Sequence, residues 1–288
     1  MGMLDGKRIV VTGASRGLGR AFATALASEG ASVVLNGTNA ELIDGLVDEI
    51  TAAGGTAVPA VGSVADDDVA AGIVGTCVEH FGGIDAVVNN AGIVRDRTLM
   101  KMTPAEFDEV VAVNLRGVWS VSRHAAAAMR DTGGLLLQII SNSAFTGSVG
   151  QTNYAASKAG VMGMFYAWDT ELARFGIRVN ALWPIAATDM TEVVFANAAR
   201  RAADAGQEAP TARQLGFGQP DDVAPIVVYL CSDRAAHLRS QLFTFNGTKL
   251  ATWQHPVEID VQRRDHWTID QLDAAIGTAD QRVHVPEF

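Results

Sequence analysis

Three side chains between residues 141 and 158 have the types and spacing needed for proton transfer. Ser141 lies 13 residues before Tyr154, and Lys158 follows Tyr154 by four residues. If residues 154–175 form a helix, Tyr154 and Lys158 lie one turn apart on the same face. A phenol has a pKa of about 10, and a nearby ammonium is expected to lower that pKa toward the working range. The three residues could then pass a proton to or from a carbinol oxygen, which Ser141 would also hydrogen-bond, while a hydride moves at carbon.

A glycine-rich turn near the N-terminus favours this chemistry over a chance surface pair of Tyr154 and Lys158. Residues 12–19 read TGASRGLG, between a predicted strand at 8–12 and a predicted helix at 17–29. Its glycines would let the backbone turn tightly and approach a pyrophosphate, and the helix N-terminus would present N–H groups and a positive dipole end. An ordinary βα turn is the alternative, but the position between a first strand and a first helix favours a dinucleotide site.

The elements that must position these groups alternate between apolar β-branched segments and helical patterns. This alternation predicts an α/β fold, a doubly wound parallel sheet with helices on both faces. Strands are predicted at 8–12, 32–36, 56–61, 86–89, 135–140, 178–182 and 242–245. Helices are predicted at 17–29, 40–53, 66–81, 103–129, 154–175 and 221–230.

The chain is predicted to form one core domain, residues 1–248, with two less regular parts. Residues 185–218 combine proline, glycine and polar residues around a short alanine-rich helix. They would overhang the carboxyl ends of the strands, and we expect them to be a mobile substrate lid. Residues 249–288, with a helical pattern at 268–276, are expected to pack as an extension on the core or on a neighbouring subunit.

Composition excludes several functional classes. The 288 residues carry a net charge of −10, which argues against binding to nucleic acid or to anionic membranes. The two cysteines form no CxxC pattern and the six histidines are scattered, so neither a disulfide nor a metal site is predicted. No apolar run approaches the ~20 residues needed to span a bilayer, and no signal core precedes the first strand. We therefore expect a cytoplasmic protein without a membrane span.

Four motifs in order resemble the short-chain dehydrogenase/reductase family. They are TGxxxGxG at 12–19, NNAG at 89–92, an asparagine at 114 between valine and leucine, and the Ser141, Tyr154 and Lys158 set. The resemblance covers about residues 5–248 and implies a seven-stranded Rossmann-type sheet and a nicotinamide cofactor. It also implies an NAD(P)-dependent enzyme that interconverts a hydroxyl and a carbonyl.

The resemblance implies a role for each candidate residue. Tyr154 would be the acid-base group, and Ser141 would position the substrate oxygen. Lys158 would bind the nicotinamide ribose and tune Tyr154, while Asn114 would hold a water that links Lys158 to a proton relay. The residues expected to bind the cofactor are Gly13, Ser15, Arg16, Gly17, Leu18, Gly19, Thr38, Ser63, Val64, Asn90, Ala91, Gly92, Tyr154, Lys158, Ile185 and Thr188.

The residues around the adenosine ribose favour NADP(H), although NAD(H) remains possible. NAD enzymes usually place a carboxylate near the end of the second strand, and residues 34–38 read VLNGT. Arg16 could pair with a 2′-phosphate, and Thr38 could add a hydroxyl. An exposed loop charge is the alternative interpretation of Arg16.

At three positions near the expected cofactor site, the residue in this chain can be compared with the one that the family usually has. Ser63 stands where the family usually has an aspartate that touches the adenine. Ile185 replaces the usual glycine after Pro184, and its N–H is still expected to reach the nicotinamide carboxamide. Thr188 keeps the family's hydroxyl near the cofactor.

Two subgroups of the family are the most similar in residues 90–97 and 150–154. One comprises β-ketoacyl carrier-protein reductases, and the other comprises 3-hydroxyacyl-CoA dehydrogenase domains of multifunctional enzymes, whose members also act on hydroxysteroids. Residues 184–186, 222–225 and the long tail lean toward the second subgroup. The expected substrate is therefore an acyl-CoA or a steroid-like molecule oxidised or reduced at C3, with Arg95 and Arg97 meeting CoA phosphates. A 3-oxoacyl-carrier-protein reductase and a catalytically silent dinucleotide-binding protein remain as alternatives.

Family resemblance also implies a homodimer or homotetramer. Members usually pair through the helices that carry Asn114 and Tyr154. The apolar residues expected on the outer faces of those helices are Val118, Val121, Ala125, Val161, Met164 and Phe165.

Overall fold

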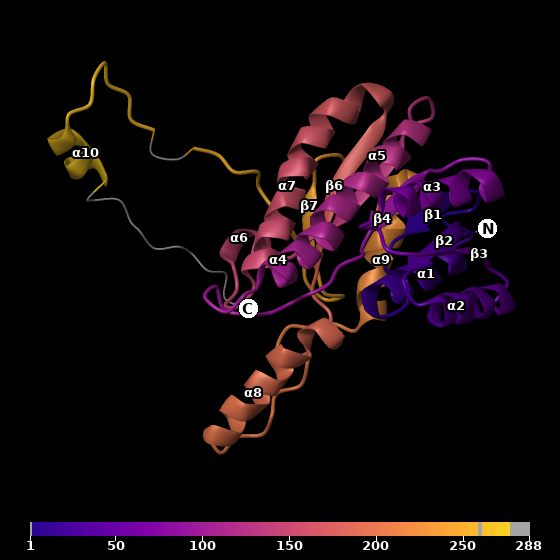
Figure 1. Ribbon diagram of the computed structural model, residues 1–288, viewed down its shortest axis with the longest axis horizontal. Helices are drawn as coiled ribbons and strands as arrows, with labels where there is room; N and C mark the ends of the chain where they lie inside the picture. Colours follow the sequence, from indigo (N-terminus) through magenta and orange to yellow (C-terminus); the bar gives the residue numbers. More distant parts are fainter. Residues whose placement is uncertain (1, 259–260, 277–288) are drawn as a thin grey trace. The chain divides into compact units, whose positions relative to one another are not determined.

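A computed structural model of the chain describes residues 2–258 and 261–276 (Figure 1). These residues belong to two compact units, one that extends to Trp253 and one that begins at Gln254. Within the two described ranges, no helix is long and apolar enough to cross a membrane. The predicted cytoplasmic location stays a prediction.

The first unit is built on one eight-stranded sheet with the order β3-β2-β1-β4-β5-β6-β7-β8. The first seven strands are parallel, and the predicted α/β doubly wound fold is confirmed. The sheet order reverses between β1 and β4, so a crevice is expected at the carboxyl ends of these two strands. The strands are β1 (Arg8–Val11), β2 (Ser32–Gly37), β3 (Thr56–Val61), β4 (Ala86–Asn89), β5 (Gly134–Ile139), β6 (Ile177–Pro184), β7 (Leu242–Phe245) and β8 (Leu250–Thr252).

The eighth strand corrects the expected count of seven. Strand β8 runs antiparallel to β7, because a tight turn reverses the chain between them. Gly247 has a φ of 90°, and the side-chain oxygen of Asn246 accepts the N–H groups of Thr248 and Lys249 at 2.9 and 2.6 Å. Such a left-handed glycine and a capped asparagine favour a hairpin that apolar periodicity alone does not reveal. The first unit therefore extends beyond the predicted boundary at residue 248.

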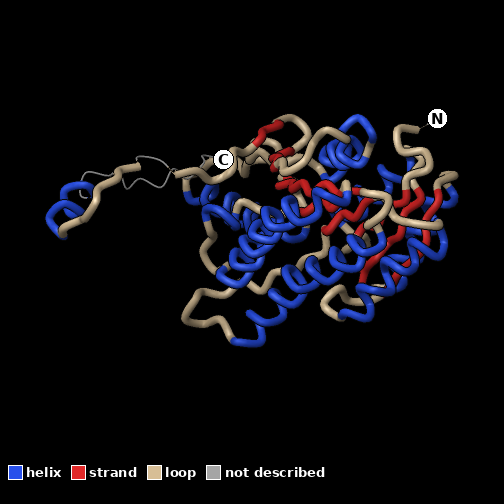
Figure 2. Tube along the Cα trace, turned by 90° about the horizontal axis from the view of Figure 1, so that it is seen from above, coloured by secondary structure: helices blue, strands red, loops and turns tan. Residues whose placement is uncertain are grey.

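Helices cover both faces of the sheet, as predicted (Figure 2). Helices α1 (Gly17–Ser28), α2 (Ala40–Ala52) and α9 (Pro220–Cys231) pack on one face, where Phe22, Leu26 and Val227 are buried. Helices α3 (Asp67–Phe81), α5 (Val118–Ala128) and α7 (Thr152–Leu172) pack on the other.

The predicted helix at 103–129 is continuous in direction but not in type. It comprises α4 (Pro104–Val111), a π-helical segment (Ala112–Gly117) and α5. The π segment turns Asn114 inward, where it is fully buried and bonded to the main chain of Ile93. Single π-helical turns inside α-helices are often found at functional sites.

Helix α8 (Glu192–Asp204) occupies the predicted lid and projects away from the sheet in Figure 1. Ala202 is its one buried side chain. The base of this segment is tied down, because the N–H of Ala187 donates to the carbonyl of Gly218 at 2.8 Å. Its role as a lid stays a prediction.

The second unit contains helix α10 (Ile269–Ile276), close to the helical pattern predicted at 268–276. The guanidinium of Arg264 lies 4.8 Å from the centroid of the Trp267 ring. The predicted docking of this extension on the core or on a neighbouring subunit stays a prediction.

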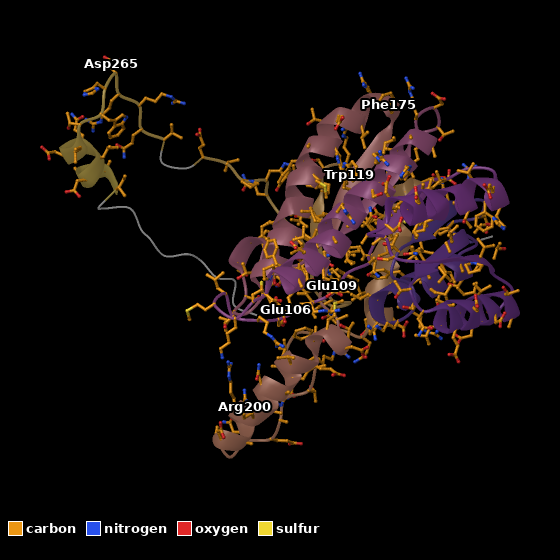
Figure 3. The ribbon with its side chains drawn as sticks, in the orientation of Figure 1. Glu106, Glu109, Trp119, Phe175, Arg200 and Asp265 are labelled. Atoms are coloured by element: carbon orange, nitrogen blue, oxygen red, sulfur yellow. The ribbon has the colours of Figure 1, made fainter. Side chains whose placement is uncertain are left out.

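Most of the apolar residues that were expected on the outer faces of the pairing helices are instead buried in the core. The prediction that they form an exposed pairing face is therefore wrong. Burial in the core leaves at most 5% of Val118, Val121, Ala125, Val161 and Phe165 exposed, because they face the sheet and neighbouring helices. Met164 is partly exposed. On the outer side of α5 lies Trp119, which is 42% exposed (Figure 3). A homo-oligomer stays a prediction that these residues do not support.

Strand β1 is joined to the start of β4 by an ion pair whose loss should destabilise the fold. The carboxylate of Asp85 accepts the main-chain N–H, Nε and Nη2 of Arg8 at 2.8, 2.7 and 2.9 Å. Burial raises the pKa of Asp85, but the hydrogen bonds and charge of Arg8 outweigh it and hold that pKa below its ordinary value. The ionised carboxylate therefore stabilises the fold above the ordinary pKa of about 4, and this stabilisation is lost as the pH falls through the lowered folded pKa.

We predict that Asp85→Asn lowers the free energy of unfolding by about 2 kcal/mol at pH 7, since it removes a charge-assisted bidentate pair. The difference from wild type should shrink as the pH falls below about 4. Urea denaturation at pH 7 and pH 3.5 measures both values. Asp233→Asn is the matched control, because Asp233 is 87% exposed and pairs with Lys7 at the surface, and it should cost under about 0.5 kcal/mol. Equal losses for the two variants would contradict the prediction.

Candidate active site

The loops that follow β1 and β4 interlock at the expected crevice. The Thr12 hydroxyl accepts the N–H groups of Asn90 and Ala91, each at 3.0 Å. The amide of Asn90 donates back to the carbonyls of Thr12 and Gly13 at 3.0 and 3.1 Å. Thr12 was not among the predicted site residues, although it is the first residue of the glycine motif. Its hydroxyl holds the two loops at a fixed separation.

Glycine is required where these loops meet. A Cβ on Gly19 would lie 2.1 Å from the carbonyl oxygen of Gly13, and one on Gly13 would lie 2.8 Å from the Cα of Ala91. Gly17 has a φ of 55°, which side chains rarely adopt. The turn opens helix α1 with main chain that no side chain shields at these positions, so the residues present fit a dinucleotide pyrophosphate. Ser15 and Gly92 belong to the same two loops, and Leu18 lies in the first turn of α1.

The polar side chain at the end of β2 hydrogen-bonds the neighbouring main chain and does not face a ribose hydroxyl. The buried Asn36 amide donates to the carbonyls of Ala60 and Gly62 at 2.8 and 3.0 Å. Thr38 is exposed just beyond it. The Ser63 hydroxyl accepts the N–H of Ala65 at 3.3 Å, and Val64 packs at Gly117, where a Cβ would lie only 2.6 Å from its Cγ2.

The base of the predicted lid touches the glycine turn. The methyl group of Thr188 lies 3.6 Å from where a Cβ of Gly17 would be. The guanidinium of Arg16 is 3.5 Å from the carboxylate of Asp189, with 77% and 72% of the two side chains exposed. The expectation that the Ile185 N–H is open to a carboxamide is wrong, because that N–H donates to the carbonyl of Phe245 at 2.9 Å. The chain past β6 runs on beside the end of β7, and this main-chain bond uses the donor.

Helix α7 brings Tyr154 and Lys158 together near Ser141, which follows β5. The ammonium of Lys158 lies 5.7 Å from the centroid of the Tyr154 ring and donates to the carbonyl of Ile139 at 2.8 Å. Ser141 hydrogen-bonds the phenol of Tyr154. The three predicted groups therefore meet at the carboxyl end of β5.

Asn153 fixes the start of this helix and was not predicted from the sequence. Its buried amide donates to the carbonyls of Arg95 and Glu106, both at 3.0 Å. Its oxygen accepts the N–H of Tyr154 at 2.8 Å. Asn153 adjoins Tyr154 in the motif, but its long-range partners cannot be identified from that position alone.

Burial dominates the electrostatics of the site. It raises the pKa of Tyr154 to about 12, while the hydrogen bond with Ser141 opposes the rise and the charge of Asp96 adds to it. Burial also lowers the pKa of Lys158 to about 8. The expected lowering of the phenol pKa is therefore not found, because burial outweighs the hydrogen bond. Tyr154 is neutral at pH 7, which makes it a proton donor.

Asn114 lies behind the crevice and holds the loop after β4. Its side-chain oxygen accepts the Ile93 N–H at 2.8 Å, and its amide donates to the Ile93 carbonyl at 2.9 Å. Its oxygen is also 3.5 Å from where a Cβ of Gly92 would lie. Each end of the side chain therefore makes one hydrogen bond with Ile93, and the predicted water at Asn114 stays a prediction.

Arg95 and Arg97 are paired with carboxylates of α4. Arg95 contacts Glu109 at 2.8 and 2.6 Å, and Arg97 lies 3.2 Å from Glu106. Figure 3 labels the two glutamates on α4. Both pairs are exposed to solvent and therefore weak, so the phosphate contacts expected of these arginines stay a prediction. Across residues 2–258 and 261–276, no group of three or more histidine, cysteine, aspartate or glutamate residues could hold a metal ion.

Comparisons with known proteins agree with this geometry. Residues 7–199 match the short chain dehydrogenase family. The chain is 38% identical over 246 residues to the 3-oxoacyl-[acyl-carrier-protein] reductase FabG of Thermotoga maritima, covering 85% of this chain and 98% of that protein. It is 39% identical over 267 residues to the hydroxyacyl-CoA dehydrogenase ChsB1 of Mycobacterium tuberculosis, covering 88% of this chain and 81% of that protein. The crystal structure of a short chain dehydrogenase from Mycobacterium avium matches with a TM-score of 0.79 and 37% identity, covering 96% of this chain and 95% of that one.

The buried ammonium of Lys158 should make stability depend on pH in a defined window. The folded state releases this proton near pH 8, whereas the unfolded chain keeps it to about 10.5. The unfolded state binds more protons between these values, so this group makes stability rise with pH. Relative to Lys158→Met, the free energy of unfolding of wild type should rise by about 3 kcal/mol from pH 7.5 to 10.5. Urea denaturation of both proteins across that range measures the difference, and parallel pH profiles would contradict the assigned burial.

Proposed function

The chain belongs to the short-chain dehydrogenase family and is an oxidoreductase of the NAD(P)-binding kind, and we propose that it interconverts a hydroxyl and a carbonyl at C3 of an acyl-CoA or steroid-like substrate. The observation that carries the proposal is the placement of Tyr154 and Lys158 one turn apart on α7, with the ammonium 5.7 Å from the phenol ring and Ser141 beside them after β5. The relatives named for 3-oxoacyl and hydroxyacyl substrates support the same reaction class.

Three side chains divide the proton chemistry between them. In the reductive direction the phenol of Tyr154 donates its proton to the carbonyl oxygen, and Ser141 donates a hydrogen bond to the same oxygen. The ammonium of Lys158 stabilises the phenolate that remains. A bound nicotinamide supplies or accepts the hydride. Asn114 positions the loop after β4 through Ile93, and the reverse sequence of proton transfers serves oxidation.

The rim of the crevice suits an apolar substrate. Leu99 and Met100, after β4, are 73% and 95% exposed, and Val149, after β5, is 95% exposed. The two loops lie side by side, because the N–H of Arg97 donates to the carbonyl of Gly150 at 2.8 Å. Exposed apolar patches of this kind mark ligand sites. An acyl chain or a ring system attached to a thioester would cover them.

A 3-oxoacyl-carrier-protein reductase is the second candidate. The chain matches 98% of a relative that carries this name, and the same apolar rim would accept a carrier-bound acyl chain. Activity on acyl-CoA in the absence of a carrier protein favours the first candidate, and activity on carrier-bound acyl chains alone favours the second.

NADP(H) is the proposed cofactor because the residues at the adenosine end offer positive charge and no carboxylate. The Asn36 amide hydrogen-bonds carbonyls in and just after β3, and the Arg16 side chain is exposed on the glycine turn. The one ion-pair partner of Arg16 in the described part of the chain is the exposed Asp189. An exposed pair is weak, so the guanidinium can exchange it for a 2′-phosphate.

We also propose that residues 185–218 close over bound substrate. Helix α8 presents Val193 and Val194, which are 63% and 46% exposed. The base of the segment is fixed at Gly218 while its helix projects. Closure would bring apolar side chains toward the rim and exclude water.

The acid-base role predicts that Tyr154→Phe lowers kcat by about 10²–10⁴-fold on a 3-oxoacyl-CoA with NADPH, since the proton donor is lost while the ring remains. NADPH affinity should stay within about threefold of wild type. Steady-state turnover and fluorescence titration measure the two quantities. Tyr229→Phe, on the exposed face of α9, is the control and should leave turnover unchanged. Wild-type turnover by Tyr154→Phe would exclude the proposed role.

The cofactor assignment predicts that Arg16→Ala weakens NADPH binding at least tenfold and NADH binding less than twofold, because only NADPH carries the 2′-phosphate. Side-by-side titration of both cofactors tests this. Arg20→Ala is the control, because Arg20 lies further along α1 and pairs with Glu49 of α2. Tighter binding of NADH than NADPH by wild type would reverse the assignment.

A further inference from the structure

Trp253, directly after β8, packs against the core on the face of the sheet that α5 and α7 cover. Its indole N–H donates to the buried hydroxyl of Thr244 at 2.7 Å. Its ring stacks on Phe145 with a centroid distance of 4.8 Å and an interplanar angle of 20°. The centroid of the same ring lies 5.8 Å from that of Trp183, which is on β6 just before the predicted lid. One side chain therefore links β7, β6 and the segment after Ser141.

Phe145 lies four residues after Ser141, in the short helix α6 (Ser143–Thr146). Hydrogen bonds within the segment connect the two, since the N–H of Ser143 donates to the Ser141 hydroxyl at 3.3 Å. Phe145 is 38% exposed even with the indole against it. Helix α6 packs beside the start of α7, which carries Tyr154 (Figure 1). The uncovered part of the Phe145 ring thus lies on the segment that carries a reacting group.

The segment from 141 to 151 has few other apolar anchors. The Ser143 hydroxyl contacts Ser148 and Gln151 at 3.2 and 3.1 Å, while Val149 is 95% exposed. An offset aromatic stack contributes stabilisation beyond the area that it buries. The single indole donor to Thr244 also fixes how the Trp253 ring is turned. The stack with Trp253 therefore restrains the Phe145 ring from the side of β8.

We propose that Trp253 is a positioning residue that holds Phe145 as a fixed wall for the apolar part of the substrate. The inference rests on the proposed function for its substrate, an acyl thioester with a long chain or a ring system. A wall that is rigid before binding saves the cost of ordering it, so it favours substrates long enough to reach it. A substrate with a single carbon beyond C3, such as acetoacetyl-CoA, is too short to use the wall, whereas a long chain or a ring system is held by it.

The test compares wild type, Trp253→Ala and Trp253→Phe with NADPH on acetoacetyl-CoA and on a long-chain 3-oxoacyl-CoA. Trp253→Ala should raise KM for the long-chain substrate about tenfold, with KM for acetoacetyl-CoA and kcat for both substrates within threefold. Trp253→Phe keeps an aromatic stack and should restore KM to within threefold of wild type. Trp119→Ala removes an exposed indole from the outer side of α5 and is the control for loss of a tryptophan.

Two further measurements separate positioning from general destabilisation. Deuterium exchange of residues 141–151 should accelerate in Trp253→Ala and not in Trp119→Ala. Phe145→Ala should reproduce the KM change, and the double variant should be no worse than either single variant, since both remove one contact. Equal losses of kcat/KM on both substrates, or no change on either, would overturn the proposal.

Failure of the proposed function has a different signature. If wild type binds NADPH but reduces neither thioester, the substrate assignment is wrong, and the exchange data alone decide the positioning role. Unchanged exchange in Trp253→Ala then overturns that role, and faster exchange confined to the segment sustains it.

Discussion

The close approach of the two loops after β1 and β4 is the constraint on which the site depends. The sheet order reverses there, so both strands deliver their following residues to one crevice. Thr12 and Asn90 fasten the loops to each other, and glycine at 13 and 19 removes the side chains that would push them apart. The catalytic set is built outward from this crevice, with Asn114 held to the loop after β4 and Ser141 following the next strand in the sheet. A shift between β1 and β4 would displace every candidate group at once.

The site is maintained against an electrostatic cost. Lys158 keeps an ammonium almost out of contact with water, with the Ile139 carbonyl as its hydrogen-bond partner. Tyr154 is held neutral by the same burial that disfavours the charge on Lys158. A site that must exclude water to direct a proton is expected to carry such costs, and the packed sheet and helices on both faces offset them.

Much of the fold could be predicted because its signals are local. The strands at 56–61, 86–89 and 242–245 have the predicted bounds, since each is a short apolar run between turn signals. The glycine turn is equally local. The features that were not predicted depend on partners distant in sequence: the hairpin that adds β8, the Phe245 carbonyl that takes the Ile185 N–H, and the Thr244 and Phe145 contacts of Trp253. The residues on α5 and α7 expected to face outward were misplaced because apolar periodicity identifies a face but not what covers it. The direction of the Tyr154 pKa was missed because helical spacing gives the neighbour but not the depth of burial.

The strand order also sets how the sheet can assemble during synthesis. Strands β1, β2 and β3 pair in chain order on one side of the β1–β4 contact, and strands β4, β5, β6, β7 and β8 pair in chain order on the other side. The pairing of β1 with β4, in which Ile9 meets Ala86, is the single step that joins strands not consecutive in sequence. That step must close the chain around β2 and β3, and the later strands can then be added one by one as they leave the ribosome. The β8 hairpin is added last, so Trp253 becomes available to Phe145 only after the strands around the proton-transfer groups have been made.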